Sequence, residues 1–208
     1  MRRHLKVLAT LVVAFAAIAP VAFAHHMEGE AVPATWFSGL VSGLSHPIIG
    51  LDHLLFIIGI GLAAAAISRT VTLPLAFIAA TTFGVLAHMM RVDIAMVDVM
   101  VLASVVSIGA LLAVRPDMSP LLWLGLFAAS GFFHGHAYGE AIVGSEPTPL
   151  AAYLVGLAAI QLFVAAAIAT LTARVLKLSK SGIRIGGGVL AGAGMALASL
   201  LLPAAGPG

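Results

Sequence analysis

The sequence contains no cysteine, and only 9% of its 208 residues are charged. The chain therefore has no disulfide framework, no thiolate metal site and no cysteine nucleophile, and bonding gives no information about its redox compartment. Any metal ion must be held by nitrogen, oxygen or thioether ligands. The ten Lys and Arg residues form no basic stripe. The pI near 9.4 consequently does not indicate a nucleic-acid partner.

Hydrophobic residues, by contrast, make up 62% of the chain. Several uninterrupted apolar stretches are long enough to cross the hydrocarbon core of a bilayer, which is about 30 Å thick. The sequence therefore predicts an all-α integral membrane protein, and residues 36–44 are expected to lie at the membrane interface before the first span. Six transmembrane helices are predicted, at 48–67, 72–90, 94–114, 119–140, 149–173 and 184–203.

The first 24 residues have the three parts of a secretory signal peptide. A basic start with Arg2 and Arg3 is followed by an apolar stretch and then by AFA, a small-x-small pattern that ends at Ala24. We expect cleavage after Ala24, so that residues 1–24 are a signal peptide and residues 25–208 form the six-helix transmembrane domain. An uncleaved first transmembrane helix is the alternative.

Basic residues in the connectors predict the orientation, because Lys and Arg are retained on the cytoplasmic side of a membrane. With the mature N-terminus outside, the outer connectors hold only Arg91. The inner connectors hold Arg69, Arg115, Arg174, Lys177, Lys180 and Arg184. The pattern therefore predicts a protein of the bacterial inner membrane with both mature termini outside the cytoplasm.

Ionisable side chains gather in the outer half of this predicted bundle. Each costs roughly 2.5 kcal/mol or more when it faces lipid, so such groups usually turn inward and mark ion or proton pathways. Four of the predicted helices contribute at least one, which predicts a shared metal site open to the outer face, assisted by His25 and His26. The candidate ligands are His46, Asp52, His53, His88, Asp98, His134, His136 and Glu140.

The stretch HPIIGLDH opens the first predicted span. Pro47 suits the first turn of a helix, where its missing N–H is not needed, and it favours an extended conformation for His46. Asp52 then falls within the first turns of the helix, where a carboxylate is stabilised. His53 points about 100° away from Asp52 and needs a ligand from another helix to complete a site.

The fourth predicted span carries the second cluster, FFHGHAYGEA. His136 and Glu140 are four residues apart and share one helix face, which makes half of a metal site. Glycines at four-residue intervals from Gly131 to Gly139 predict close packing with a neighbouring helix. Gln161, alone in the fifth span, is expected to form an interhelical hydrogen bond.

These clusters resemble the motifs of the HupE/UreJ family of nickel permeases. The family pattern HPxxGxDHxxxM is matched from His46 to His53, with Ile57 where the family has Met. The pattern FHGxAHGxE is matched at His134, but Tyr138 replaces the usual His and Glu140 comes one position early. The resemblance implies secondary uptake of Ni²⁺ that supplies hydrogenase or urease. It assigns transport to His46, Asp52, His53, His134 and Glu140.

Several alternatives remain at this point. Imidazole and carboxylate suit Co²⁺, Cu²⁺ and Zn²⁺ as well as Ni²⁺, so ligand type does not select the metal. An accessory protein that senses or hands over metal would use the same residues. A b-type haem protein would explain some histidines but not the acids, and an intramembrane serine protease lacks the required histidine after His136. We expect no enzyme activity, no permanently bound cofactor and, as partners, a divalent cation and the bilayer; a homo-oligomer is left open.

Overall fold

The computed structural model describes residues 32–69 and 71–201, so the predicted signal peptide, His25 and His26 lie outside the described part of the chain. Within that part the secondary structure is helical, with no strand. The elements are α2 (Trp36–Ile49), α3 (Leu51–Ala66), α4 (Thr72–Met89), α5 (Val97–Val114), α6 (Pro120–Gly139), η1 (Glu140–Ile142), α7 (Pro147–Thr170), η2 (Leu171–Val175) and α8 (Lys180–Ser199). The predicted spans correspond to α3 to α8. The largest shift is at α8, which starts and ends four residues before the prediction.

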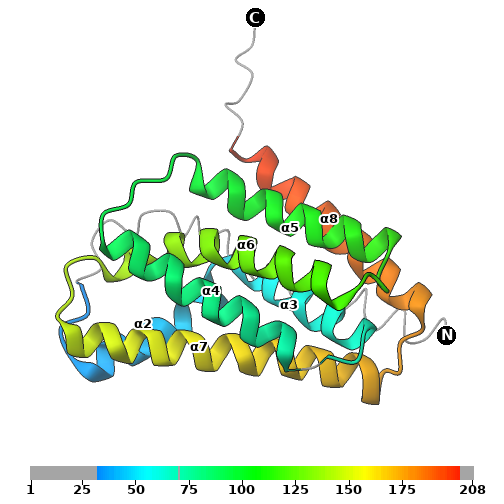
Figure 1. Ribbon diagram of the computed structural model, residues 1–208, viewed down its shortest axis with the longest axis horizontal. Coiled ribbons are helices and arrows are strands. Elements are labelled where there is room, and N and C mark those ends of the chain that lie inside the picture. Colours follow the sequence, from blue (N-terminus) through cyan, green and yellow to red (C-terminus); the bar gives the residue numbers. More distant parts are fainter. Residues whose placement is uncertain (1–31, 70, 202–208) are drawn as a thin grey trace, which may run out of the picture.

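Helix α3 is the central element of the bundle. Eleven of its sixteen residues are buried, and it contacts every other α-helix. Around it the helices associate most extensively in three pairs, α4 with α6, α2 with α7, and α5 with α8 (Figure 1). A helix that is apolar all round, as α3 is after its first turn, is suited to this position because none of its faces needs water.

Four helices are long and apolar enough to cross a bilayer: α4, α5, α7 continued by η2, and α8. Helices α2 and α3 are bent by 80° at their junction and would make a fifth span if they count as one broken helix. Helix α6 is not among these candidates although it has 20 residues, and polar residues interrupt its second half. The described residues therefore contain four or five candidate spans.

The start of the first predicted span differs from the prediction. Pro47 does not open a helix but lies inside α2, and His46 is in the last turn of that helix instead of extended before it. Helix α2 ends at Gly50, whose N–H donates to the His46 carbonyl oxygen at 3.0 Å. Pro47 has no N–H to donate, which weakens this helix locally, and the close packing of α2 on α7 stabilises it.

Glycines let the paired helices approach closely. A side chain at Gly39 or Gly43 of α2 would overlap the backbone of α7 at Pro149 or Tyr153. Gly39 meets Pro149 and Gly43 meets Tyr153, so the residue numbers of the contacts increase along both helices. Helices α2 and α7 are therefore parallel, and α2 lies along the length of α7. The sequence did not predict this packing, and the place of residues 36–44 at the membrane interface stays a prediction.

Glycines also let α4 and α6 approach each other closely. A side chain at Gly135 would overlap the backbone of Thr81, and one at Gly84 would overlap the carbonyl of Phe132. Gly131 and Gly139 likewise face Phe77 and His88, both on α4. The predicted glycine stripe of α6 is therefore confirmed as the surface on which α4 packs.

The connectors divide between two ends of the bundle (Figure 1). The start of α2, the α4–α5 connector and the α6–α7 connector lie at one end, on the left in Figure 1, which we call the polar end. The connectors α3–α4, α5–α6 and α7–α8 lie at the other end, which we call the basic end because it carries Arg69, Arg115, Lys177 and Lys180. There the Lys180 ammonium donates to the Asp117 carboxylate at 2.7 Å, and this hydrogen bond lowers the Asp117 pKa.

Candidate metal centre

The break between α2 and α3 brings the first motif into the interior of the bundle. Asp52 is in the first turn of α3 and accepts a hydrogen bond from the His53 backbone N–H at 2.8 Å. Both side chains are buried, with 8% and 5% of their surfaces exposed. His46, on the other side of the break, has its ring centroid 5.9 Å from that of His53. A short helix, a bend and a second helix therefore place the three motif residues together.

His53 on α3 meets His134 on α6, with their Nδ1 atoms 2.9 Å apart. His134 is fully buried, and its Nε2 lies 2.9 Å from the Ser104 hydroxyl oxygen on α5. The Ser104 hydroxyl donates its own proton to the Val101 carbonyl oxygen at 2.6 Å. The His134 Nε2 must therefore carry a proton and donate to Ser104, which leaves the His134 Nδ1 lone pair facing His53. We call His53 and His134 the deep pair.

Aromatic rings enclose the deep pair. The Tyr138 ring centroid is 4.3 Å from that of His53, and the Phe56 centroid is 4.5 Å from that of His134. Phe77 closes another side of His134 at 5.6 Å. This enclosure excludes water, which strengthens any electrostatic interaction formed by the two imidazoles.

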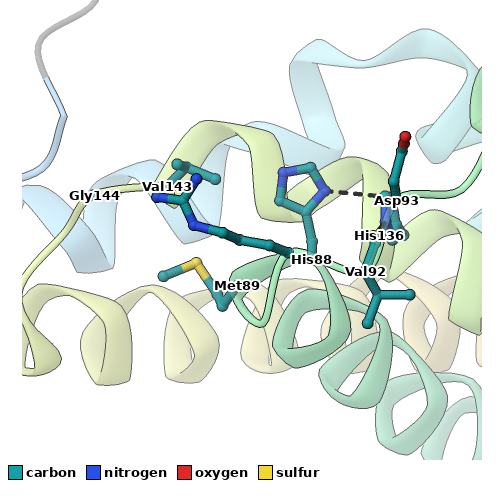
Figure 2. A pocket seen from close by; sticks show the side chains of 8 residues that line it. His88, Met89, Val92, Asp93, His136, Val143 and Gly144 are labelled. Carbon is teal, nitrogen blue, oxygen red and sulfur yellow. Dashed lines mark hydrogen bonds between the residues drawn. The ribbon is translucent and has the colours of Figure 1, made fainter.

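His88 on α4 and His136 on α6 form a second pair, with their Nδ1 atoms 3.3 Å apart. His136 Nε2 lies 2.8 Å from the Val92 carbonyl oxygen. A carbonyl only accepts, so His136 Nε2 carries the proton and its Nδ1 lone pair faces His88. We call these residues the outer pair. They border a cavity of about 300 Å³ at the polar end, lined also by Met89, Arg91, Val92, Asp93, Val143 and Gly144 (Figure 2).

The N···N distances of both pairs are those of a hydrogen bond, and they also match the distance between two ligands of one metal ion. Imidazole nitrogens bind divalent metals at about 2.0–2.1 Å, so two of them lie about 2.9 Å apart at an octahedral angle and about 3.3 Å apart at a tetrahedral one. The nitrogen atoms are separated by 2.9 Å in the deep pair and 3.3 Å in the outer pair. In each pair the second nitrogen of one ring is held by an oxygen, as is usual for metal-binding histidines.

The candidate ligands do not gather at one point. Within the described residues, no group of three or more His, Asp or Glu side chains lies close enough to hold a metal ion. Glu140 is exposed at the end of α6, near enough to His88 to act on it electrostatically. Asp98 is half-buried in the first turn of α5. The structure thus pairs four of the eight candidates through their nitrogen atoms and leaves the predicted single cluster divided into two.

A buried polar contact joins α4 to α7 beside these pairs. The Thr81 hydroxyl donates to the Ile78 carbonyl oxygen at 2.8 Å and lies 3.3 Å from the Gln161 side-chain oxygen, so the interhelical role expected for Gln161 is confirmed. When the oxygen and nitrogen of the Gln161 amide are exchanged, the amide nitrogen donates to the Thr81 hydroxyl oxygen. The amide oxygen then faces the Tyr138 hydroxyl, which is within reach. That orientation gives every buried polar atom of this group a partner.

Sequence reasoning missed Ser104, because one serine in an apolar helix carries no signal of its own. It also missed Asp93. This residue follows Val92, whose backbone carbonyl oxygen accepts a hydrogen bond from His136. These two residues could be identified only by knowing that α5 and the α4–α5 connector lie against α6.

The described residues define a helical bundle of a membrane protein with paired histidines in its interior. The family model described as "HupE / UreJ protein" matches residues 13–197, and the chain belongs to this family. It is similar to the protein named "Protein HupE" from Rhizobium leguminosarum bv. viciae, with 28% identity over 163 residues, which cover 76% of this chain and 84% of that protein. No solved structure matches the chain.

Proposed function

We propose that this protein is a secondary transporter of a divalent transition metal, with Ni²⁺ as its principal cation. The observation that carries the proposal is the deep pair, in which His53 and His134 face each other at 2.9 Å inside an apolar bundle. Ionisable groups at such a depth are costly and usually mark a pathway for ions. The preference for nickel rests on the family and on the relative named "Protein HupE", and delivery to hydrogenase or urease is part of the proposal.

In this proposal a cation reaches the deep pair from the polar end. His53 and His134 supply nitrogen ligands, and the neighbouring Asp52 carboxylate supplies negative charge. His46 has its ring 5.9 Å from His53, so movement of α2 relative to α3 about Gly50 would add or remove a third ligand. Ligand exchange at this bend provides a means of release.

The orientation in the proposal follows from charge. The basic end faces the cytoplasm of the bacterial inner membrane, because Lys and Arg residues are retained there, and the mature N- and C-termini lie outside after signal-peptide cleavage. Six spans result if the α2–α3 pair counts as one and α6 crosses the membrane within the bundle. An inward-negative potential favours inward movement of a dication by about 4.6 kcal/mol per 100 mV, twice the value for a single charge.

A second candidate function is an accessory protein that holds metal without translocating it. The observation that favours it is the apolar cluster between the deep pair and the basic end. Helix α3 continues from the site into a cluster that includes Ile60, Leu73, Leu112, Trp123 and Phe127, all of which are fully buried. A cation leaving in this direction needs the cluster to open.

Uptake of radioactive Ni²⁺ by proteoliposomes distinguishes the two candidates. We expect accumulation by the wild type, competition by Co²⁺, Cu²⁺ and Zn²⁺, and loss of accumulation in Asp52→Asn and His53→Ala. Accumulation that is unchanged in both variants would refute the proposed site. Binding of Ni²⁺ by the purified wild type without accumulation in sealed vesicles would support the accessory role.

A further inference from the structure

We propose that the outer pair is a separate metal site, which captures the hydrated divalent cation before it reaches the deep pair. The two pairs are carried by His134 and His136, two positions apart on α6. Successive helical residues turn by about 100°, so these side chains point in nearly opposite directions. One ion cannot bind both, and a cation that uses the two pairs must do so in succession. The inference rests on the proposed function only in taking the ligand to be the transported cation.

In the outer pair, as in the deep pair, a hydrogen bond to an oxygen atom fixes the proton of one histidine and leaves its other nitrogen free of a proton. The Val92 carbonyl oxygen fixes the proton of His136 on Nε2, and this directs the Nδ1 lone pair towards His88. The Nδ1 proton of His88 then bridges the 3.3 Å between the two nitrogens. When His88 adopts its other tautomer, with the proton on Nε2, both Nδ1 lone pairs become available to one ion without loss of a proton.

The surroundings of the outer pair differ from those of the deep pair in ways that suit capture. The cavity of about 300 Å³ is much larger than a bare ion needs, so a cation held by two nitrogens keeps part of its water shell. A partly hydrated ion with two protein ligands costs less dehydration and leaves more readily than one in an enclosed site. Figure 2 shows the contact of His88 with His136 as a dashed line, with Asp93 and Val92 of the α4–α5 connector beside His136.

Charge near the outer pair favours a cation. Asp93 lines the cavity, and Glu140 acts electrostatically on His88. Arg91 also lines the cavity. All three side chains are exposed, so solvent screens each of them alike, and together they carry one net negative charge. A structural role is the competing explanation, because the His88–His136 contact also ties α4 to α6.

The test counts bound Ni²⁺ ions on purified protein in lipid nanodiscs by equilibrium dialysis. We expect two ions per wild-type chain and one per chain in both His88→Leu and His136→Asn. Phe83→Leu, also on α4, is the matched control, because Phe83 is exposed and does not line the cavity, and it should still bind two. In uptake assays the first two variants should raise KM by at least about tenfold, because loss of a ligand should cost no less than loss of a residue that only orients one. Vmax should stay within about twofold of wild type, a change of less than 0.5 kcal/mol.

Other outcomes separate this site from the proposed function. Two ions per chain in His88→Leu, or one ion per wild-type chain that is lost in His53→Ala, would overturn the outer site. A lowered melting temperature in both variants with unchanged binding and KM would assign the contact a structural role and overturn the site as well. Wild-type protein that binds two ions, loses one in His88→Leu and transports none would retain the outer site and refute the transporter.

Discussion

His53 on α3 and His134 on α6 face each other through their Nδ1 atoms at 2.9 Å, although 81 positions separate them in the sequence. Each comes from one of the two motifs that the sequence marks, and the hydroxyl of Ser104 on a third helix fixes the proton of His134. The pair therefore depends on a residue outside both motifs, and this dependence can be measured.

Replacing Ser104 by alanine should weaken Ni²⁺ binding at the deep pair by about 10–100-fold, the usual cost of losing a partner that orients a metal-binding histidine. Without the hydroxyl, His134 is free to carry its proton on Nδ1, the nitrogen that must bind the metal. Isothermal titration of the purified protein gives the affinity. Ser107→Ala on the same helix is the control, because Ser107 is exposed, and equal affinities in the two variants would contradict the role of Ser104.

Replacing Tyr138 by histidine should make the chain hold metal more tightly. The Tyr138 ring lies 4.3 Å from His53 and 5.3 Å from His46, so an imidazole at this position adds a third nitrogen to the deep pair. We expect the dissociation constant for Ni²⁺ to fall by about tenfold, equivalent to about 1.4 kcal/mol, and release into vesicles to slow. Tyr138→Phe keeps the ring without adding a ligand, and an equal gain in that control would rule out this explanation.

A methyl group at Gly135 should destabilise the bundle. It would overlap the backbone of Thr81 on α4, and such overpacking typically costs about 1–3 kcal/mol. The melting temperature in detergent should fall below that of the wild type. Gly125→Ala tests the same substitution on the same helix where no atom lies within 4 Å, so its melting temperature should not fall. Equal melting temperatures for the two variants would show that α4 and α6 are not packed so closely.

The orientation can be tested with single cysteines, since the chain contains none. Glu146 at the polar end and Ser181 near the basic end are both exposed. In intact spheroplasts a membrane-impermeant maleimide should label Glu146→Cys, and it should label Ser181→Cys only after permeabilisation. The reverse pattern would contradict the proposed direction of transport.

The sequence predicted the helices well because their apolar runs are long and their boundaries carry Pro, Gly or charge. Ser119 caps α6 just before Pro120, for example, and Ser179 caps α8. It failed at Pro47, because local rules place proline at a helix start, whereas the contact of Gly39 and Gly43 with α7 extends the helix through that residue. Such a contact joins segments about a hundred residues apart and leaves no local pattern.

The candidate site was predicted in its residue types but not in its arrangement. The motifs identified the histidines of both pairs, since ionisable groups are conspicuous in apolar helices. The gathering of ionisable groups from four helices in the outer half of the bundle suggested that His134 and His136 serve one site. Their opposite directions on the helix separate them, and the packing of α4 on one face of α6 and of α3 on another determines which partner each one meets.

The length of α2 has a consequence for how the protein is made. Its 14 residues extend only about 21 Å at 1.5 Å per residue, which is less than the bilayer core of about 30 Å. Helix α2 therefore cannot be inserted stably by itself, and the surface that holds it belongs to α7, which leaves the ribosome about a hundred residues later. We expect the chain to complete the surroundings of His46 late in biosynthesis, so that a truncated or stalled chain lacking α7 does not hold His46 beside the deep pair.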